Sequence, residues 1–323
     1  LQDLRNVLDD KIPERRVDHN LVLATWNLRV FGGLTKKWHS APGDSPRRDL
    51  HSIRCIAEIL SRFDVVALQE VRSDLRALRH TLKVLNDPDP HWGVILTDVC
   101  KSRSGNYERM AFLFDTRRVK PCGLAAELVV PQEVLDANKL KEIALDRQFV
   151  RTPYAVSFYS GGRTFILVTT HIIYGDKTDT AERRKEIAAI ADWLADWARD
   201  LADDGREHNL ITLGDFNIKS KDGPLYDALT SRGLRTPIEL DKAKRTIFEE
   251  TPYSHYDQIA WFTEGNGKIP HLSLEYRHTA GSFDFQPPGM RDLDLSDLEL
   301  SWRISDHLPL WAEFLLRPQH GGV

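Results

Sequence analysis

The sequence passes twice through a strand, a helix and a second strand, and this repeat limits the folds that the chain can adopt. The first pass ends at Glu70 and the second at Asp215. The expected elements are strands at 21–31, 64–71, 163–170 and 209–213, and helices at 49–61 and 180–202. Each half alone would leave one face of its sheet open, so we expect the two halves to bury each other in one domain.

A glycine pair in the second half indicates antiparallel pairing. Gly161-Gly162 separates two strand-like runs at 155–160 and 163–170, which is a strong hairpin signal. An α/β (α+β) fold of two mostly antiparallel sheets, packed face to face with flanking helices, therefore fits better than a single doubly wound sheet. The other expected elements are a short helix near 4–8, strands at 91–98, 109–115, 257–262 and 308–316, a mixed segment at 116–148 and helices at 224–229 and after a Ser73 cap. The expected boundaries are an N-terminal extension at 1–20, one domain at 21–317 and a tail at 318–323.

The composition is that of an ordinary globular chain. The 323 residues are 41% hydrophobic and 28% charged, with a formal net charge of −4 and a pI of about 6.3. This balance carries no global basic signature for nucleic acid, although a local basic cleft can sit on an acidic protein. No apolar run approaches the length of a membrane span, so we expect no membrane partner.

The cysteines and the start of the chain bear on its compartment. Cys55, Cys100 and Cys122 are far apart and odd in number, without zinc-type spacing, so we expect reduced thiols and a cytoplasmic protein. No signal peptide stands at the start. The chain begins at Leu1 rather than Met, which leaves a removed leader and a secreted form open.

The second pass ends in the segment 210–217, where an apolar run is followed by glycine, an acid and an amide. Residues two apart in a strand point to the same face, so Asp215 and Asn217 would project side by side where the run reaches solvent. Together they can hold a hard cation, a phosphate oxygen or an attacking water. An Asx turn that caps the next segment explains the same residues equally well.

The same arrangement, an apolar run bounded by a chemically active side chain, recurs along the chain. The other instances are Asn27, Glu70, Glu108, His171, Asp257, Asp306 and His307. Taken singly, Asn27 fits a strand-end turn and His171 fits a satisfied buried histidine. Glu70 by itself fits a surface ion pair with Arg72 or Arg76. Taken together they predict an active site, because scaffolds usually place function in loops at sheet edges.

This inventory suits the metal-assisted attack of water on a phosphodiester. A divalent cation takes hard oxygen ligands and keeps several waters. A histidine takes the proton of the attacking water, and a carboxylate orients that histidine. The sequence lacks a cysteine cluster for zinc, a Walker-type glycine–lysine loop and a Gly-x-Ser-x-Gly elbow, which removes several rival classes.

In this order the residues resemble a known superfamily. The matching segments are Asn27-Leu28-Arg29-Val30-Phe31-Gly32, Leu68-Gln69-Glu70-Val71-Arg72, Glu108-Arg109, Thr170-His171, Gly214-Asp215-Phe216-Asn217, Tyr256-Asp257-Gln258-Ile259, Phe283-Asp284-Phe285-Gln286 and Ile304-Ser305-Asp306-His307. The ordered set spans residues 21–316 and resembles the endonuclease/exonuclease/phosphatase superfamily, within it most of all the deoxyribonuclease I-like branch. The resemblance implies a four-layer αββα sandwich with the site at one rim of the two sheets.

The resemblance also implies roles for these positions. The implied ligands of Mg²⁺ or Mn²⁺ are Glu70 and Asp306, with Asn27 beside the metal and the phosphate. The implied acid/base pairs are His307 with Asp257 and His171 with Glu108. The implied positioners of the water or the phosphate are Asp215 and Asn217. The implied contacts to the nucleic-acid backbone are Arg29, Arg72 and Arg151. Ca²⁺ is a further candidate as a structural or co-activating ion.

We therefore expect a metal-dependent DNA endonuclease that acts as a monomer, with two departures from the branch. Ser220 and Ser254 stand where one disulfide of the branch would lie. Tyr107 directly precedes Glu108, out of register for the groove-stacking tyrosine, which weighs against a preference for duplex DNA.

The alternatives are a phosphatase or phospholipase of the same superfamily and a binding module that has lost catalysis. Inositol phosphatases usually carry Cys-Asp-Arg-Ile where this chain has Tyr-Asp-Gln-Ile at 256–259. Abasic-site endonucleases have Thr-Lys after the glutamate, whereas Glu70 is followed by Val-Arg. The complete set of carboxylates and histidines counts against an inactive module.

Overall fold

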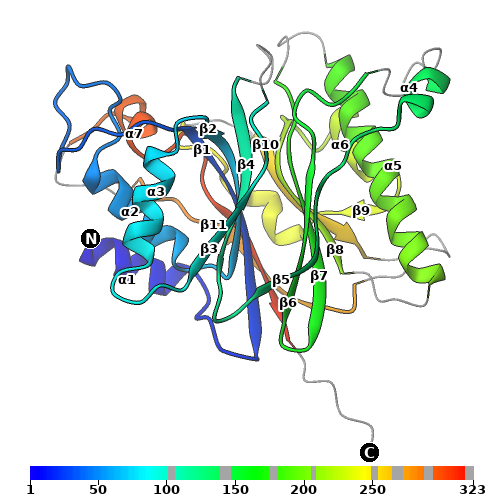
Figure 1. The fold of residues 1–323 in the computed structure, drawn as a ribbon, viewed down its shortest axis with the longest axis horizontal. Helices are drawn as coiled ribbons and strands as arrows, with labels where there is room; N and C mark the ends of the chain where they lie inside the picture. Colours follow the sequence, from blue (N-terminus) through cyan, green and yellow to red (C-terminus); the bar gives the residue numbers. More distant parts are fainter. Residues whose placement is uncertain are drawn as a thin grey trace, which may run out of the picture.

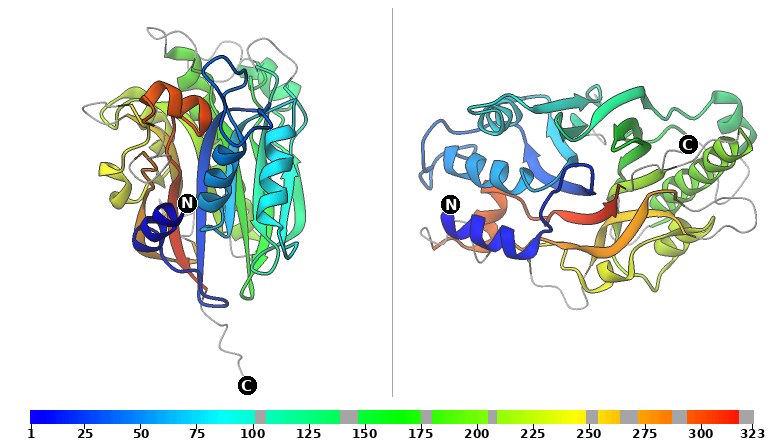
Figure 2. Two further views of the ribbon diagram at one scale, coloured as in Figure 1. Left: turned by 90° about the vertical axis from the view of Figure 1, so that its left-hand side faces the viewer. Right: turned by 90° about the horizontal axis from the view of Figure 1, so that it is seen from below.

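Two six-stranded sheets pack face to face, and helices cover the outer side of each sheet (Figure 1). The computed structural model describes residues 1–100, 106–138, 147–174, 180–204, 209–248, 254–263, 272–286 and 294–316. Figure 2 shows the same layers from the side and from below. The expected four-layer sandwich of two mostly antiparallel sheets is thereby confirmed.

The first sheet has the strand order β11-β12-β1-β2-β4-β3. Its strands are β1 (Asn20–Phe31), β2 (Val65–Arg72), β3 (Trp92–Leu96), β4 (Glu108–Asp115), β11 (Glu275–Ser282) and β12 (Leu310–Leu315). The helices on its outer side are α1 (Gln2–Lys11), α2 (Leu50–Leu60), α3 (Arg76–Leu85) and α7 (Asp297–Arg303).

The second sheet has the order β5-β6-β7-β8-β10-β9. Its strands are β5 (Lys120–Glu127), β6 (Tyr154–Ser160), β7 (Arg163–His171), β8 (Leu210–Ile218), β9 (Leu234–Arg235) and β10 (His255–Phe262). The helices α4 (Gln132–Asn138), α5 (Ala181–Asp203) and α6 (Pro224–Thr230) accompany it, and a 3₁₀ helix, η1 (Ile238–Lys242), follows β9.

Strand β1 shows why the chain forms layers. Its side chains alternate between two cores: Leu21 and Leu23 pack between the sheets, whereas Val22 and Ala24 pack under the helices. Residues of opposite parity point to opposite faces of a strand, so an apolar run of both parities is buried on both sides. The central strands therefore read as continuous apolar segments in the sequence.

Each sheet contains one parallel pair, and both pairs belong to the expected strand–helix–strand units. Strand β1 runs through α2 into β2, and β7 runs through α5 into β8, each time in parallel register. All other neighbours pair antiparallel. Because the carboxyl ends of parallel strands meet at one edge, both units deliver their last residues to the same rim, beside α7 at the top of Figure 1.

A glycine allows the second parallel pair to close. At Gly214, which has a φ of +150°, an added Cβ would lie 2.1 Å from the carbonyl oxygen of Thr170 on β7. Real Cβ atoms do not come this close to backbone, so no other residue fits here without moving the two strands apart. The glycine before Asp215 is thus a packing requirement.

The structure corrects one local expectation and adds detail to two others. Ser73 does not cap α3, which begins at Arg76 without a side-chain cap, while Asp74 Oδ1 accepts the Arg76 N–H. The mixed segment 116–148 contains β5 and α4 in its described part. Helix α1 of the N-terminal segment buries Leu4 and Leu8 against the same core as α2, and the tail 318–323 lies outside the described residues.

Two further features concern the whole chain. Cys55, Cys100 and Cys122 are free thiols, the first of them buried. Among the described residues, no helix has both the length and the apolar character needed to cross a membrane.

Candidate active site

One carboxylate oxygen at the rim is approached from three directions. Asp215 Oδ2, near the end of β8, accepts a hydrogen bond from Asn27 Nδ2 on β1 at 3.0 Å. His171 Nε2, from the end of β7, lies 3.7 Å from the same oxygen, and His307 Nε2, from the segment before β12, lies 4.0 Å away. The structure thus brings four predicted site residues from both sheets to one point.

Asp215 also makes the turn that was the alternative explanation of this segment. Its Oδ1 accepts the backbone N–H of Asn217 at 2.9 Å, which is the hydrogen bond of an Asx turn. Asn217 has a φ of +51° and donates its side-chain amide to the carbonyl oxygen of Ile172 at 2.7 Å. One oxygen of Asp215 therefore shapes the strand end, and the other faces the histidines.

His171 is oriented by a buried glutamate that two arginines surround. Its Nδ1 lies 3.0 Å from Glu108 Oε2. Arg151 Nε is 2.9 Å from the same oxygen, and an Arg72 nitrogen is 3.4 Å from Oε1. Burial alone would raise the pKa of Glu108, but nearby His171, Arg151 and Arg72 outweigh it and hold the pKa below its usual value.

His307 is oriented by a buried aspartate in a more acidic setting. Its Nδ1 lies 2.8 Å from Asp257 Oδ2, and Asp257 is fully buried. Burial raises the pKa of Asp257 to about 6, against the opposing effect of His307. Burial alone would lower the pKa of His307, but Asp257, Asp215 and Asp306 together raise it well above its usual value.

The two predicted metal carboxylates lie at the partly exposed side of the site. Glu70, with a φ of +59°, accepts the Val30 N–H on Oε2 at 2.8 Å. Asp306 Oδ2 lies 3.6 Å from an Arg29 nitrogen. Their partners Val30 and Arg29 are adjacent residues of β1, which places both carboxylates on the same side of the rim.

The donor set fits a hard cation that keeps several waters. Among the described residues, no group of three or more His, Cys, Asp or Glu side chains is arranged so that it could hold a metal ion. Asn27 Oδ1 is buried without a hydrogen-bond partner, while the Nδ2 of the same amide donates to Asp215. This orphaned oxygen and the carboxylates of Glu70 and Asp306 are the ligand types that Mg²⁺ and Mn²⁺ take.

The three arginines that are predicted to contact the nucleic-acid backbone differ in solvent exposure. The side chain of Arg151 is only 6% exposed and is engaged by Glu108 and by the carbonyl oxygen of His171. Arg29 and Arg72 are 22% and 23% exposed and lie beside Asp306 and Glu70. The site therefore offers two arginines to a ligand and holds the third inside.

Arg48, which joins the end of β1 to the end of α7 at the rim, was not identified from the sequence. This buried guanidinium donates to the carbonyl oxygens of Arg29 and Val30 on β1 and to those of Arg303 and Ile304 at the end of α7. Arg48 lies in a polar loop of the sequence, and nothing in that loop indicates that its side chain is buried. The short helix α7 was also missed, although its capping box, Ser296 with Glu299, is readable in the sequence.

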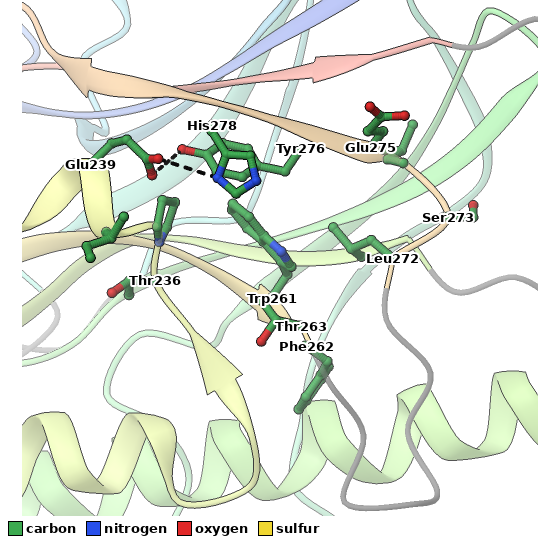
Figure 3. A pocket seen from close by; sticks show the side chains of 13 residues that line it. Thr236, Glu239, Trp261, Phe262, Thr263, Leu272, Ser273, Glu275, Tyr276 and His278 are labelled. Atoms are coloured by element: carbon green, nitrogen blue, oxygen red, sulfur yellow. Dashed lines mark hydrogen bonds and ion pairs between the residues drawn. The ribbon is translucent and has the colours of Figure 1, made fainter.

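A cavity of about 500 Å³ lies elsewhere, between η1, β10 and β11 (Figure 3). Trp261 and Tyr276 form its aromatic part, and Tyr276 donates to Glu239 Oε2 at 2.8 Å. Trp261 lies four residues beyond Asp257 on β10, about 13 Å along the strand. The cavity contains none of the predicted site residues.

Comparison with known proteins agrees with this architecture. Residues 24–293 match the Endonuclease/Exonuclease/phosphatase family. The chain is 27% identical over 308 residues to deoxyribonuclease-1 of Canis lupus familiaris, covering 90% of each protein.

Solved structures share the fold at low sequence identity. One is TDP2 of D. rerio complexed with single-strand DNA product, with 15% identity, a TM-score of 0.53 and coverage of 91% of this chain and 98% of that one. Another is a mannosyl-6-phosphatase of Bacteroides thetaiotaomicron, with 16% identity, a TM-score of 0.53 and coverage of 91% and 99%. The family match covers most of the chain, including both parallel strand units and both histidine-orienting carboxylates. This protein therefore belongs to the endonuclease/exonuclease/phosphatase family.

Proposed function

We propose that the protein is a metal-dependent phosphodiesterase, and specifically a DNA endonuclease. The observation that carries the proposal is the convergence of two carboxylate-oriented histidines on Asp215 Oδ2, beside the carboxylates of Glu70 and Asp306. The similarity to a deoxyribonuclease along nine-tenths of both chains supports DNA as the substrate.

The two histidines divide the proton transfers. Each Nδ1 faces its carboxylate, so each Nε2 is the nitrogen turned toward the reacting groups. One imidazole takes the proton of the attacking water, and the other gives a proton to the departing oxygen. Asp215, within 4.0 Å of both, orients the water between them, and Asn217 holds Asp215 in place.

The remaining residues bind the substrate and the cation. Glu70, Asp306 and Asn27 would hold Mg²⁺ or Mn²⁺, which when bound offsets the charge on the phosphate, and Ca²⁺ is a further candidate ion. Arg29 and Arg72 would contact neighbouring phosphates, which adds affinity without reading sequence. Arg151 would act from inside, by fixing Glu108.

A substrate panel tests the proposal. It contains plasmid, single-stranded DNA, RNA, abasic duplex, an inositol phosphate and sphingomyelin, each with Mg²⁺, Mn²⁺, Ca²⁺ or EDTA. We expect cleavage of DNA with Mg²⁺ or Mn²⁺, none with EDTA, and a loss of several orders of magnitude in Glu70→Ala. Hydrolysis of the inositol phosphate alone would favour a phosphatase, and cleavage of no nucleic acid would overturn the endonuclease.

One control variant and one measurement of oligomeric state accompany the panel. Glu275→Ala removes a carboxylate that lines the separate cavity and should leave cleavage unchanged. Size-exclusion chromatography with light scattering tests the expected monomer, with a mass near 37.0 kDa.

A further inference from the structure

A tryptophan with no part in the core stacks on Arg29, which contacts the candidate metal carboxylate Asp306. Trp302, on α7, is 40% exposed and precedes Asp306 by four residues. Single exposed hydrophobic residues are common and need no explanation. What sets Trp302 apart is the guanidinium of Arg29, whose Cζ lies 3.8 Å from the centre of the ring system.

The stacked guanidinium links the ring to the reaction centre. Arg29 Nη1 donates to the Ser301 hydroxyl at 2.6 Å and lies 3.6 Å from Asp306 Oδ2. The arginine is thus held between the ring of Trp302 and a carboxylate of the candidate metal site. A phosphate bound at the candidate metal site would lie beside Arg29, and the ring of Trp302 would lie on the other side of the Arg29 guanidinium.

The pair rests on a rigid base. Arg48 ties the carbonyl oxygens of Arg29 and Val30 to those at the end of α7, with four hydrogen bonds of 2.7–3.2 Å. The capping box of Ser296 and Glu299 fixes the start of the same helix. Ring and guanidinium are therefore positioned before any ligand arrives, and binding does not have to order them.

We propose that Trp302 is a base-stacking residue, which binds the unpaired nucleobase next to the phosphate that Arg29 contacts. Every nucleobase has a π face, and Arg29 covers only part of the ring, so the exposed remainder can take a base of any identity. In a duplex both faces of each base are already stacked. The pair therefore selects single-stranded or locally opened DNA, an inference that rests on the proposed nuclease function.

Binding without metal tests the stacking directly. The anisotropy of a fluorescently labelled single-stranded oligonucleotide, titrated with the full chain in EDTA at fixed salt, gives the Kd. We expect Trp302→Ala to raise this Kd about tenfold, the size that loss of one stacked base implies. Trp302→Phe, which keeps a π face, should stay within about threefold of the wild type.

A matched control and a matched ligand separate stacking from general damage. Leu298 lies one turn before Trp302 on α7 and is 58% exposed, so Leu298→Ala removes apolar surface from the same helix without removing a ring. It should leave the Kd unchanged. On an oligomer of abasic nucleotides, wild type and Trp302→Ala should bind equally, because only the phosphates remain. If alanine lowers the unfolding midpoint, Trp302→Leu keeps apolar volume without the π face and takes its place.

The outcomes distinguish this inference from the proposed function. Cleavage of no nucleic acid by the wild type would overturn both. Cleavage of DNA by the wild type, with an unchanged Kd in Trp302→Ala or an equal loss on the abasic oligomer, would overturn the stacking role alone. A preference for single strands over duplex that disappears in Trp302→Ala would support it.

Discussion

The His171–Glu108 pair and the His307–Asp257 pair occupy corresponding places in the two sheets but lie in opposite electrostatic surroundings. Glu108 is the first residue of β4 and Asp257 lies near the start of β10, and each of these strands pairs antiparallel with the second strand of a parallel unit. Each carboxylate reaches across the sandwich to a histidine supplied by the other sheet. The nitrogen–oxygen distances of the two pairs, 3.0 and 2.8 Å, are nearly the same.

The surroundings of each pair determine the direction in which the pKa of its carboxylate is shifted. His171, Arg151 and Arg72 together outweigh the effect of burial and hold the pKa of Glu108 below its usual value. Burial raises the pKa of Asp257 to about 6, with a further contribution from Asp215, against the opposing effects of His307 and the buried Arg245. The same geometry can thus serve two proton-transfer roles, because burial and neighbouring charges act on each carboxylate together with its histidine partner.

The largest expected effect tests whether both pairs are needed. His171→Ala and His307→Ala should each lower the rate of DNA cleavage by about 10²–10⁴-fold, the usual contribution of a positioned acid or base. Plasmid nicking with Mn²⁺ measures the rate, and circular dichroism checks the fold. His278→Ala, which removes an 82% exposed histidine side chain near Glu239, is the control. Near-normal activity in either site variant would contradict the proposal that one histidine accepts a proton and the other donates one.

A medium effect separates the two carboxylates. Glu108→Gln leaves the buried Arg151 without its counter-charge and should lower the free energy of unfolding by about 3 kcal/mol. Asp257→Asn removes a charge that burial disfavours, and Asp215 and Asp306 still act on His307, so the loss should stay within about 1 kcal/mol. Urea denaturation at neutral pH measures both values. Equal losses would show that the surrounding charges do not distinguish the pairs.

The smallest expected effect is the pH dependence of the stability difference between the wild type and Glu108→Gln. The pKa of Glu108 is lower in the folded chain, so its carboxylate stabilises the fold above the unfolded value of about 4.5, and this contribution is lost as the pH falls through the folded pKa. Glutamine does not titrate. The stability gap between wild type and Glu108→Gln should therefore narrow as urea titrations move from pH 7 to below 4.5, and a gap of constant size would contradict the assignment.

The central strands and long helices were predictable because they are periodic and deeply buried. Strands β1, β2, β7 and β8 bury both faces, and their apolar runs are plain in the sequence. The edge strands β5 and β11 were not predicted, because most of their side chains are exposed or half-buried and their sequences lack a clear alternation. Short elements at an edge depend on a neighbour that the local sequence does not reveal.

By itself, the sequence determined that polar side chains end the buried strands, and it indicated the family through their order. The tertiary structure decided how those side chains combine. It placed Asp215 between two histidines from different segments, enclosed Arg151, and stacked Arg29 on Trp302. The physical reason is that periodicity reports burial along one element, whereas charge environment and contact depend on residues hundreds of positions apart meeting at the rim of two sheets.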